Sequence, residues 1–178
     1  MSCATRWSPA SSPPTPAPPK MKPELSLSVQ YGVEEPRLPR WRLRRWAEHA
    51  LAAAAQDGLV EFSAAELSLR LVGAAEGRRL NRDFRERDYA TNVLTFEYGV
   101  DPLGVARGDI VMCVPVLVRE AREQRKPLLD HAAHLTLHGV LHSLGYDHIK
   151  ARDAKRREAL ETATLAQMGI ADPYVAAD

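Results

Sequence analysis

The sequence contains few cysteines, no long apolar run and almost no net charge. Its 178 residues include two cysteines, Cys3 and Cys113. Two are too few for a disulfide framework, so we expect a reducing compartment and a cytoplasmic location. No apolar stretch approaches the roughly 20 residues that a membrane-spanning helix needs, so no membrane association is expected. The formal net charge of +1 argues against a protein that coats nucleic acid through its overall charge, although a local basic patch stays open.

The N-terminal segment differs in composition from the rest of the chain. Residues 8–20 (SPASSPPTPAPPK) contain six prolines among serine, threonine and alanine. Such a segment cannot bury enough apolar surface to order itself, and it lacks the apolar region of a secretory signal. We therefore expect a disordered proline-rich tail over residues 1–22, with a start at Met21 as an open alternative. Residues 23–178 are expected to form a single domain.

Hydrophobic patterns predict both strands and helices in this domain. Alternating or β-rich runs predict four strands, at 25–31, 66–72, 92–96 and 109–113. Residues 101–104 (DPLG) lie between the last two strands and suit a hairpin or a loop across the sheet edge.

Five further segments have helical patterns, at 38–56, 74–84, 114–124, 130–144 and 152–168. Trp41 and Trp46 are expected on the packing side of the first helix, and Leu80 and Phe84 on that of the second. Strands and helices are interspersed without strict βαβ repetition. The predicted fold class is therefore α+β, with a sheet covered by helices.

Residues 138–148 (HGVLHSLGYDH) carry the strongest functional signal. His138 and His142 are four residues apart on a helical pattern, so their imidazoles project from one face and can bind one ion. Gly145 can adopt the positive φ that ends a helix, which lets His148 return and complete a set of three nitrogen ligands. A fourth position stays open for water, as catalytic zinc requires. We expect one zinc ion per chain, with Ni²⁺ or Mn²⁺ as alternatives, and hydrolysis as the reaction class.

The same spacing occurs in the H-E-x-x-H-x-x-G-x-x-H motif of metzincin peptidases. Here Gly139 occupies the position of the glutamate that acts as general base. Without that carboxylate, peptide hydrolysis lacks its proton shuttle. A peptidase is therefore the weaker alternative, and it requires a carboxylate from elsewhere in the fold.

The histidine stretch resembles the H-G-x-L-H-L-x-G-Y-D-H signature of the YbeY family of bacterial metal-dependent endoribonucleases. Residues 80–96 contain LNRDFR, Asp88 and TNVLTF, and they are similar to the family pattern L-N-x-x-F/Y-R-x-x-D-x-x-T-D/N-V-L-S/T-F. Residues 108–110 (GDI) match a third block. Ser143 and Arg107 depart from leucines that are usual in the family, but neither is a proposed ligand.

The resemblance implies a mixed sheet of about four strands flanked by helices, with the metal at one end of a cleft. It implies single-stranded RNA as substrate, and a role in 16S ribosomal RNA 3′-end maturation and in quality control of the small ribosomal subunit. The small subunit and an assembly GTPase are the partners it suggests. A metal-binding assembly or RNA-binding factor with little intrinsic catalysis stays open as the alternative.

Three arginines are further candidate site residues. The Arg85 guanidinium matches the charge that develops on phosphate oxygens during cleavage, and the family motif assigns the matching arginine this role. A structural salt bridge from Arg85 to Asp88 or Glu86 is the alternative. Arg78 and Arg82 lie at helical spacing with Arg85, so they are candidates for binding the RNA backbone.

Two residues are candidates for orienting the metal ligands rather than binding the ion. His134 lies one helical turn before His138, and a metal-bound imidazole usually donates its second N–H to a neighbour. Asp147 lies beside His148 and is a candidate for the same role, with turn formation as the alternative. The sequence indicates no general base.

Overall fold

The computed structural model describes residues 21–146 and 151–175. Within them, the chain forms one sheet of four strands in the order β1-β2-β4-β3. β1 pairs with β2 and β2 with β4 in parallel, whereas β3 pairs with β4 antiparallel, so the sheet is mixed. The strands are β1 (Glu24–Tyr31), β2 (Ala64–Val72), β3 (Val93–Val100) and β4 (Val105–Cys113).

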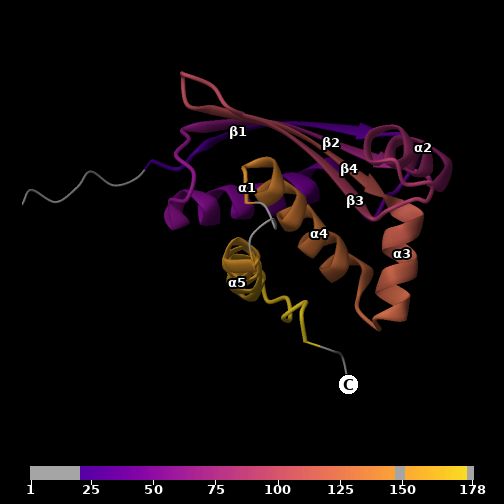
Figure 1. The fold of residues 1–178 in the computed structure, drawn as a ribbon. Helices are drawn as coiled ribbons and strands as arrows, with labels where there is room; N and C mark the ends of the chain where they lie inside the picture. The colour runs from indigo at the N-terminus through magenta and orange to yellow at the C-terminus, as the bar shows by residue number, and fades with distance from the viewer. Residues whose placement is uncertain (1–20, 147–150, 176–178) are drawn as a thin grey trace, which may run out of the picture.

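Five helices accompany this sheet in the described part of the chain: α1 (Arg40–Asp57), α2 (Ala74–Arg85), α3 (Val114–Glu123), α4 (Leu128–Ser143) and α5 (Ala151–Gln167). Figure 1 shows α1 and α4 side by side beneath the sheet, with α5 beneath both and α2 and α3 at one end. The predicted α+β class and the mixed four-stranded sheet flanked by helices are confirmed.

Strand alternation places the core between the sheet and the helices. Leu69 of β2 and Ile110 of β4 are adjacent in the sheet register and both are completely buried. Leu137 and Leu141 of α4 belong to the same buried cluster. Burying these side chains contributes roughly 1.5–3 kcal/mol each, which is why α4 holds a fixed position under the strands.

Two of the four residues predicted to pack inward are exposed. Phe84 is 61% exposed and Trp41 is 60% exposed, whereas Trp46 is buried and Leu80 is partly buried. In α1 the buried residues form one stripe that includes Trp46 but not Trp41. In α2 the buried positions are Gly77 and Asn81, so the last turn, with Phe84, lies outside the core.

The hairpin is confirmed, and its strands are longer than predicted. β3 extends to Val100 and β4 begins at Val105, joined by a turn in which Gly104 has φ +81°. Asp101 Oδ1 accepts hydrogen bonds from the backbone N–H groups of Leu103 and Val105, at 2.9 and 3.0 Å. The added segments are short and mix apolar, charged and glycine residues (EYGV at 97–100 and VARG at 105–108), so hydrophobic patterns did not reveal them.

Candidate active site

Close contact between α4 and the sheet sets the position of the histidine motif. A Cβ added at Gly139 would lie 2.9 Å from Ile110 Cγ2, and one added at Gly108 would lie 2.5 Å from Ser143 Cβ. Glycine at these two positions therefore lets the helix approach the strands. α4 ends at Ser143, one residue before the predicted end, and Gly145 after it has φ +94° and donates its N–H to the His142 carbonyl oxygen at 3.0 Å.

His138 and His142 share one cavity beside β3. The ring centroids of the two imidazoles are 4.5 Å apart. The cavity has a volume of about 400 Å³, and its lining residues are Arg85, Val93, Leu94, Thr95, Glu97, His138 and His142. His148 and Asp147 lie outside the described residues, so the third predicted ligand and its neighbour stay predictions.

Arg85 reaches this cavity from α2 across the edge of the sheet. Its Nη2 donates to the Thr95 carbonyl oxygen at 2.9 Å, and its Cζ lies 5.9 Å from the centroid of the Phe96 ring. Asp88, which sequence reasoning considered as a salt-bridge partner of Arg85, instead binds Arg78 through two hydrogen bonds of 2.7 and 2.8 Å. The guanidinium of Arg85 therefore lies in the same cavity as the two histidines.

Arg78 and Arg82 are placed differently from Arg85. Both are exposed, and neither lines the cavity. Arg78 pairs with Asp88, and Arg82 Nε lies 3.2 Å from Asp83 Oδ1. The basic surface on α2 is thus interleaved with acidic partners, and these two arginines stay candidates for contacts with RNA outside the cavity.

A buried carboxylate on α5 lies against the back of His138. Glu161 is 0% exposed, and its Oε1 is 3.0 Å from His138 Nδ1. Its other oxygen, Oε2, is 3.1 Å from His134 Nε2 and accepts a hydrogen bond from the Tyr174 hydroxyl. Burial opposes ionisation of Glu161, but hydrogen bonds from His134, His138 and Tyr174 outweigh it and hold the pKa of this carboxyl well below its usual range.

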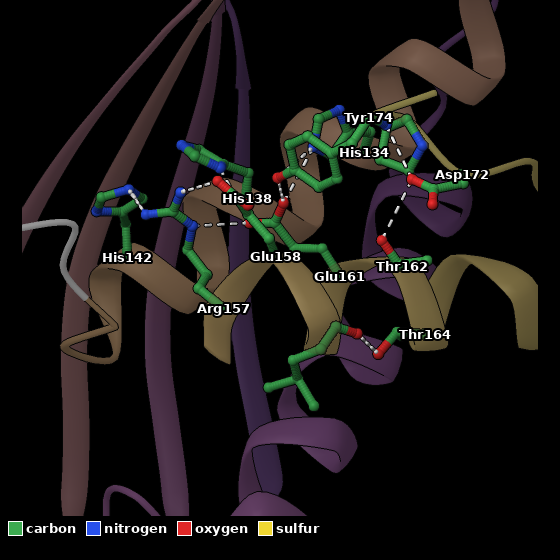
Figure 2. A network of polar contacts seen from close by, with 12 residues as sticks. His134, His138, His142, Arg157, Glu158, Glu161, Thr162, Thr164, Asp172 and Tyr174 are labelled. Carbon is green, nitrogen blue, oxygen red and sulfur yellow. Dashed lines mark hydrogen bonds and ion pairs between the residues drawn. The ribbon is translucent and has the colours of Figure 1, made fainter. Parts of the chain in front are cut away.

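Arg157 connects the same carboxylate to the second histidine of the cavity. Figure 2 shows its guanidinium between His142 and Glu161. Arg157 Nη1 donates to His142 Nε2 at 3.2 Å, and Arg157 Nε lies 3.2 Å from Glu161 Oε1. This Nε is buried and makes no aligned hydrogen bond within the described residues. His138 and His142 are therefore both contacted by side chains of α5.

His134, His138 and Glu161 are close enough to hold an ion themselves, since their ligand atoms all lie within 4.8 Å of one another. However, both oxygens of Glu161 already accept hydrogen bonds, and the Arg157 guanidinium lies beside Oε1. An ion bound there would displace these donors and would lie next to a fixed positive charge. We therefore interpret the three residues as a hydrogen-bonded cluster behind the cavity.

The cavity side of the histidines is compatible with a metal ion. When His138 Nδ1 donates to Glu161, Nε2 of the same ring carries a lone pair that can bind an ion. His142 Nε2 accepts from Arg157 in this arrangement, so an ion bound at that nitrogen would replace the Arg157 contact. Neutral imidazole nitrogens suit zinc and also nickel and other first-row ions.

Arg157, Glu161 and Tyr174 were not predicted from the sequence as site residues. Arg157 and Glu161 are four residues apart on α5, which is also the spacing of an ordinary exposed salt bridge. One sequence feature could have indicated them. His134 and His138 are also four residues apart, so α4 and α5 each carry a pair of polar side chains on one face. His134 was predicted to orient His138, and the structure places it on the same carboxylate.

Comparison with known proteins agrees with this arrangement of motifs. Residues 29–169 match the family model described as Endoribonuclease YbeY. The chain belongs to the Endoribonuclease YbeY family. The resemblance seen in the histidine stretch and in the two upstream blocks is thereby confirmed.

Relatives from this family match along nearly their whole length. Endoribonuclease YbeY of Bordetella petrii is 81% identical over 154 residues, which is 86% of this chain and 99% of that protein. The Bordetella avium protein is 76% identical over 157 residues, covering 88% of this chain and 98% of the relative. Endoribonuclease YbeY of Acidovorax sp. (strain JS42) is 49% identical over 160 residues, covering 86% and 97%.

A solved structure shares the fold. The solution structure of TM1509 from Thermotoga maritima superposes with a TM-score of 0.53 at 20% sequence identity, and the match covers 84% of this chain and 99% of that one. At this identity the likeness concerns the fold alone.

Proposed function

We propose that this protein is a metal-dependent endoribonuclease for single-stranded RNA, with one ion held by His138, His142 and His148 at one end of the cavity. The observation that carries the proposal is that one cavity contains two of these imidazoles and the Arg85 guanidinium. Zinc is the proposed ion, with Ni²⁺ or Mn²⁺ as alternatives. Family membership and the names of the relatives support RNA as the substrate.

Arg85 is the proposed catalytic residue for stabilising charge. Its bond to the Thr95 carbonyl uses one of five guanidinium donors and fixes the side chain at the cavity wall. Phosphodiester cleavage builds negative charge on the non-bridging oxygens, and a planar fork of N–H donors binds two such oxygens at once. When bound, a metal ion would act as a Lewis acid on the same phosphate or on the attacking oxygen.

Glu97 is the proposed proton acceptor, a role for which the sequence indicated no residue. Among the described residues, it is the carboxylate that lines the cavity. Its Oε1 lies close to the turn after His142, since a Cβ added at Gly145 would be 3.0 Å from it. A carboxylate there can take the proton of an attacking water or ribose hydroxyl. This carboxylate is also the feature that a peptidase would need, but family membership favours RNA.

The biological setting follows from the family resemblance and is likewise a proposal. We propose action in 16S ribosomal RNA 3′-end maturation and small-subunit quality control, in the cytoplasm, with the small subunit and an assembly GTPase as partners. Among the residues described, no helix is both long and apolar enough to cross a membrane.

Arg78 and Arg82 are proposed to contact the RNA backbone. Replacing either by alanine should reduce the slope of log affinity for RNA against log salt concentration by about 1.

The test is cleavage of single-stranded RNA by the purified protein, with and without a chelator, beside His138→Ala and a matched control, His49→Ala. His49 lies on α1 and does not line the cavity. We expect about one metal ion per chain and chelator-sensitive cleavage in the wild type and in His49→Ala, and loss of both in His138→Ala. Metal binding without cleavage would instead favour the assembly factor with little intrinsic catalysis.

A further inference from the structure

We propose that Glu161 is a positioning residue that holds the His138 imidazole with its proton on Nδ1, so that the Nε2 lone pair is directed into the cavity. The inference rests on the proposed function, because it takes His138 to be a metal ligand. It assigns a role in the active site to a carboxylate outside the histidine motif and on a different helix.

The distance between Glu161 and His138 determines which ring nitrogen carries the proton. Glu161 Oε1 lies 3.0 Å from His138 Nδ1, which is hydrogen-bonding distance for an imidazole N–H and a carboxylate. A neutral imidazole carries one proton, and the hydrogen bond made by one nitrogen decides which nitrogen keeps the lone pair. Since a carboxylate only accepts, the proton must be on Nδ1, and Nε2 is left to bind an ion.

The Glu161 carboxylate is itself held in place and cannot rotate away from His138. Its other oxygen is held by His134 Nε2 and by the Tyr174 hydroxyl, which come from α4 and from the segment after α5. The side chain is fully buried, so water cannot replace these partners. Figure 2 shows the two histidines and Tyr174 converging on this one group. Holding Oε2 therefore directs Oε1 at His138.

A second histidine–glutamate pair on α4 serves as a comparison for His138 and Glu161. His131 is also buried, and its Nε2 lies 2.8 Å from Glu120 Oε2 on α3. That pair has the same chemistry, but neither residue lines the cavity. A pair of a buried histidine and a partly exposed glutamate is thus also part of the packing of this helix, and a test must separate packing from positioning. Glu120 provides the control for this separation.

The informative variant is Arg157→Met together with Glu161→Met. Removing both members of a buried ion pair avoids leaving an unpaired charge, so the double variant should fold. The methionine at 161 offers His138 no acceptor. Because Arg157 also contacts Nε2 of the proposed ligand His142, Arg157→Met alone is the reference for zinc affinity. Glu120→Gln is the control, because it weakens the other histidine–glutamate pair and Glu120 does not line the cavity.

Two measurements test the proposal. The first, on metal-free protein, is the protonation pattern of the His138 ring from nitrogen-15 chemical shifts. We expect the proton on Nδ1 in the wild type and in Glu120→Gln, and a mixture of the two tautomers in the double variant. The second is zinc affinity by competition with a chromophoric chelator. We expect a loss of about 10–100-fold in the double variant relative to Arg157→Met, and of less than about 3-fold in Glu120→Gln relative to the wild type.

The outcomes separate this inference from the proposed function. A wild-type ring protonated on Nε2, or a double variant with the same zinc affinity as Arg157→Met, would overturn the positioning role while the metal site stands. Equal losses of affinity in the double variant and in Glu120→Gln would assign Glu161 to packing alone and also overturn it. A wild type that binds no zinc, yet carries the His138 proton on Nδ1, would overturn the proposed metal site itself.

Discussion

Arg157 Nη1 lies 3.2 Å from His142 Nε2, and the Nε of the same guanidinium lies 3.2 Å from the fully buried carboxylate of Glu161. One side chain on α5 therefore contacts both the second histidine of the motif and the carboxylate behind the first. It is 6% exposed, and its charge is compensated mainly by Glu161, with the partly exposed Glu158 farther away at 4.0 Å.

This dependence predicts a non-additive effect on stability. Arg157→Met leaves the Glu161 anion buried without its cationic partner and should cost about 3–5 kcal/mol of unfolding free energy. Adding Glu161→Met should recover most of that loss, because the pair is then replaced by two apolar side chains. The measurement is urea unfolding of the three proteins in the presence of a chelator. Equal stability of the single and double variants would argue against coupling between the two residues.

Arg85→Ala should impair cleavage while leaving metal binding intact. The guanidinium lines the cavity but is not a proposed ligand, so its removal takes away charge stabilisation alone. By comparison with the loss of one oxyanion donor, we expect a fall in the cleavage rate of about 10²–10³-fold. Rates under single-turnover conditions and metal content per chain are the measurements. Arg119→Ala, an exposed arginine on α3, should match the wild type in both.

Gly139→Glu should destabilise the protein and should not create a peptidase. The substitution restores the glutamate of the peptidase motif, but a Cβ at this position lies 2.9 Å from Ile110 Cγ2, so the side chain would enter the sheet. Overpacking of this kind costs about 1–3 kcal/mol, and a buried unpaired carboxylate adds to the cost. Thermal unfolding and a casein-cleavage assay are the measurements. A stable variant with protease activity would contradict the packing described for α4.

Glu120→Gln should remove part of the acid sensitivity of folding. Burial raises the pKa of the Glu120 carboxyl, but hydrogen bonds from His131 and Asn92 outweigh this and hold the pKa below its usual range. The folded state therefore favours the ionised form. That stability is fully present above the unfolded pKa of about 4.3 and is lost as pH falls through the lower folded pKa.

The difference in unfolding free energy between the wild type and Glu120→Gln should accordingly shrink as pH is lowered from 7 towards 3. Urea unfolding at several pH values provides the measurement. A difference that stays constant over this range would show that ionisation of Glu120 does not contribute to stability.

The elements of the fold were predictable because they are local patterns. Alternation located β1 and β2, and the 3.6-residue period located all five helices among the described residues. The hairpin strands were predicted too short, because the residues of β4 before Asp109 lack an apolar pattern. Phe84 was placed inside because periodicity marks a side of a helix and does not tell whether the last turn of α2 lies over the sheet.

The candidate site was predictable only in the part that comes from consecutive residues. His138 and His142 share a cavity because they lie on one helix, and Arg85 joined them through a motif rather than through spacing. Glu97 and Glu161 could not be found in this way. Their positions depend on where β3 and α5 lie against α4, and a single sequence does not contain the pairing of distant elements.

The residues that contact His138 and His134 are synthesised after these histidines. Glu161 follows His138 by 23 residues, and Tyr174 follows His134 by 40. A polypeptide is synthesised from its N-terminus, so the strands and α4 can emerge from the ribosome and begin to pack before α5 exists. A nascent chain that stops short of Glu161 therefore carries the histidines of α4 without the carboxylate that orients His138.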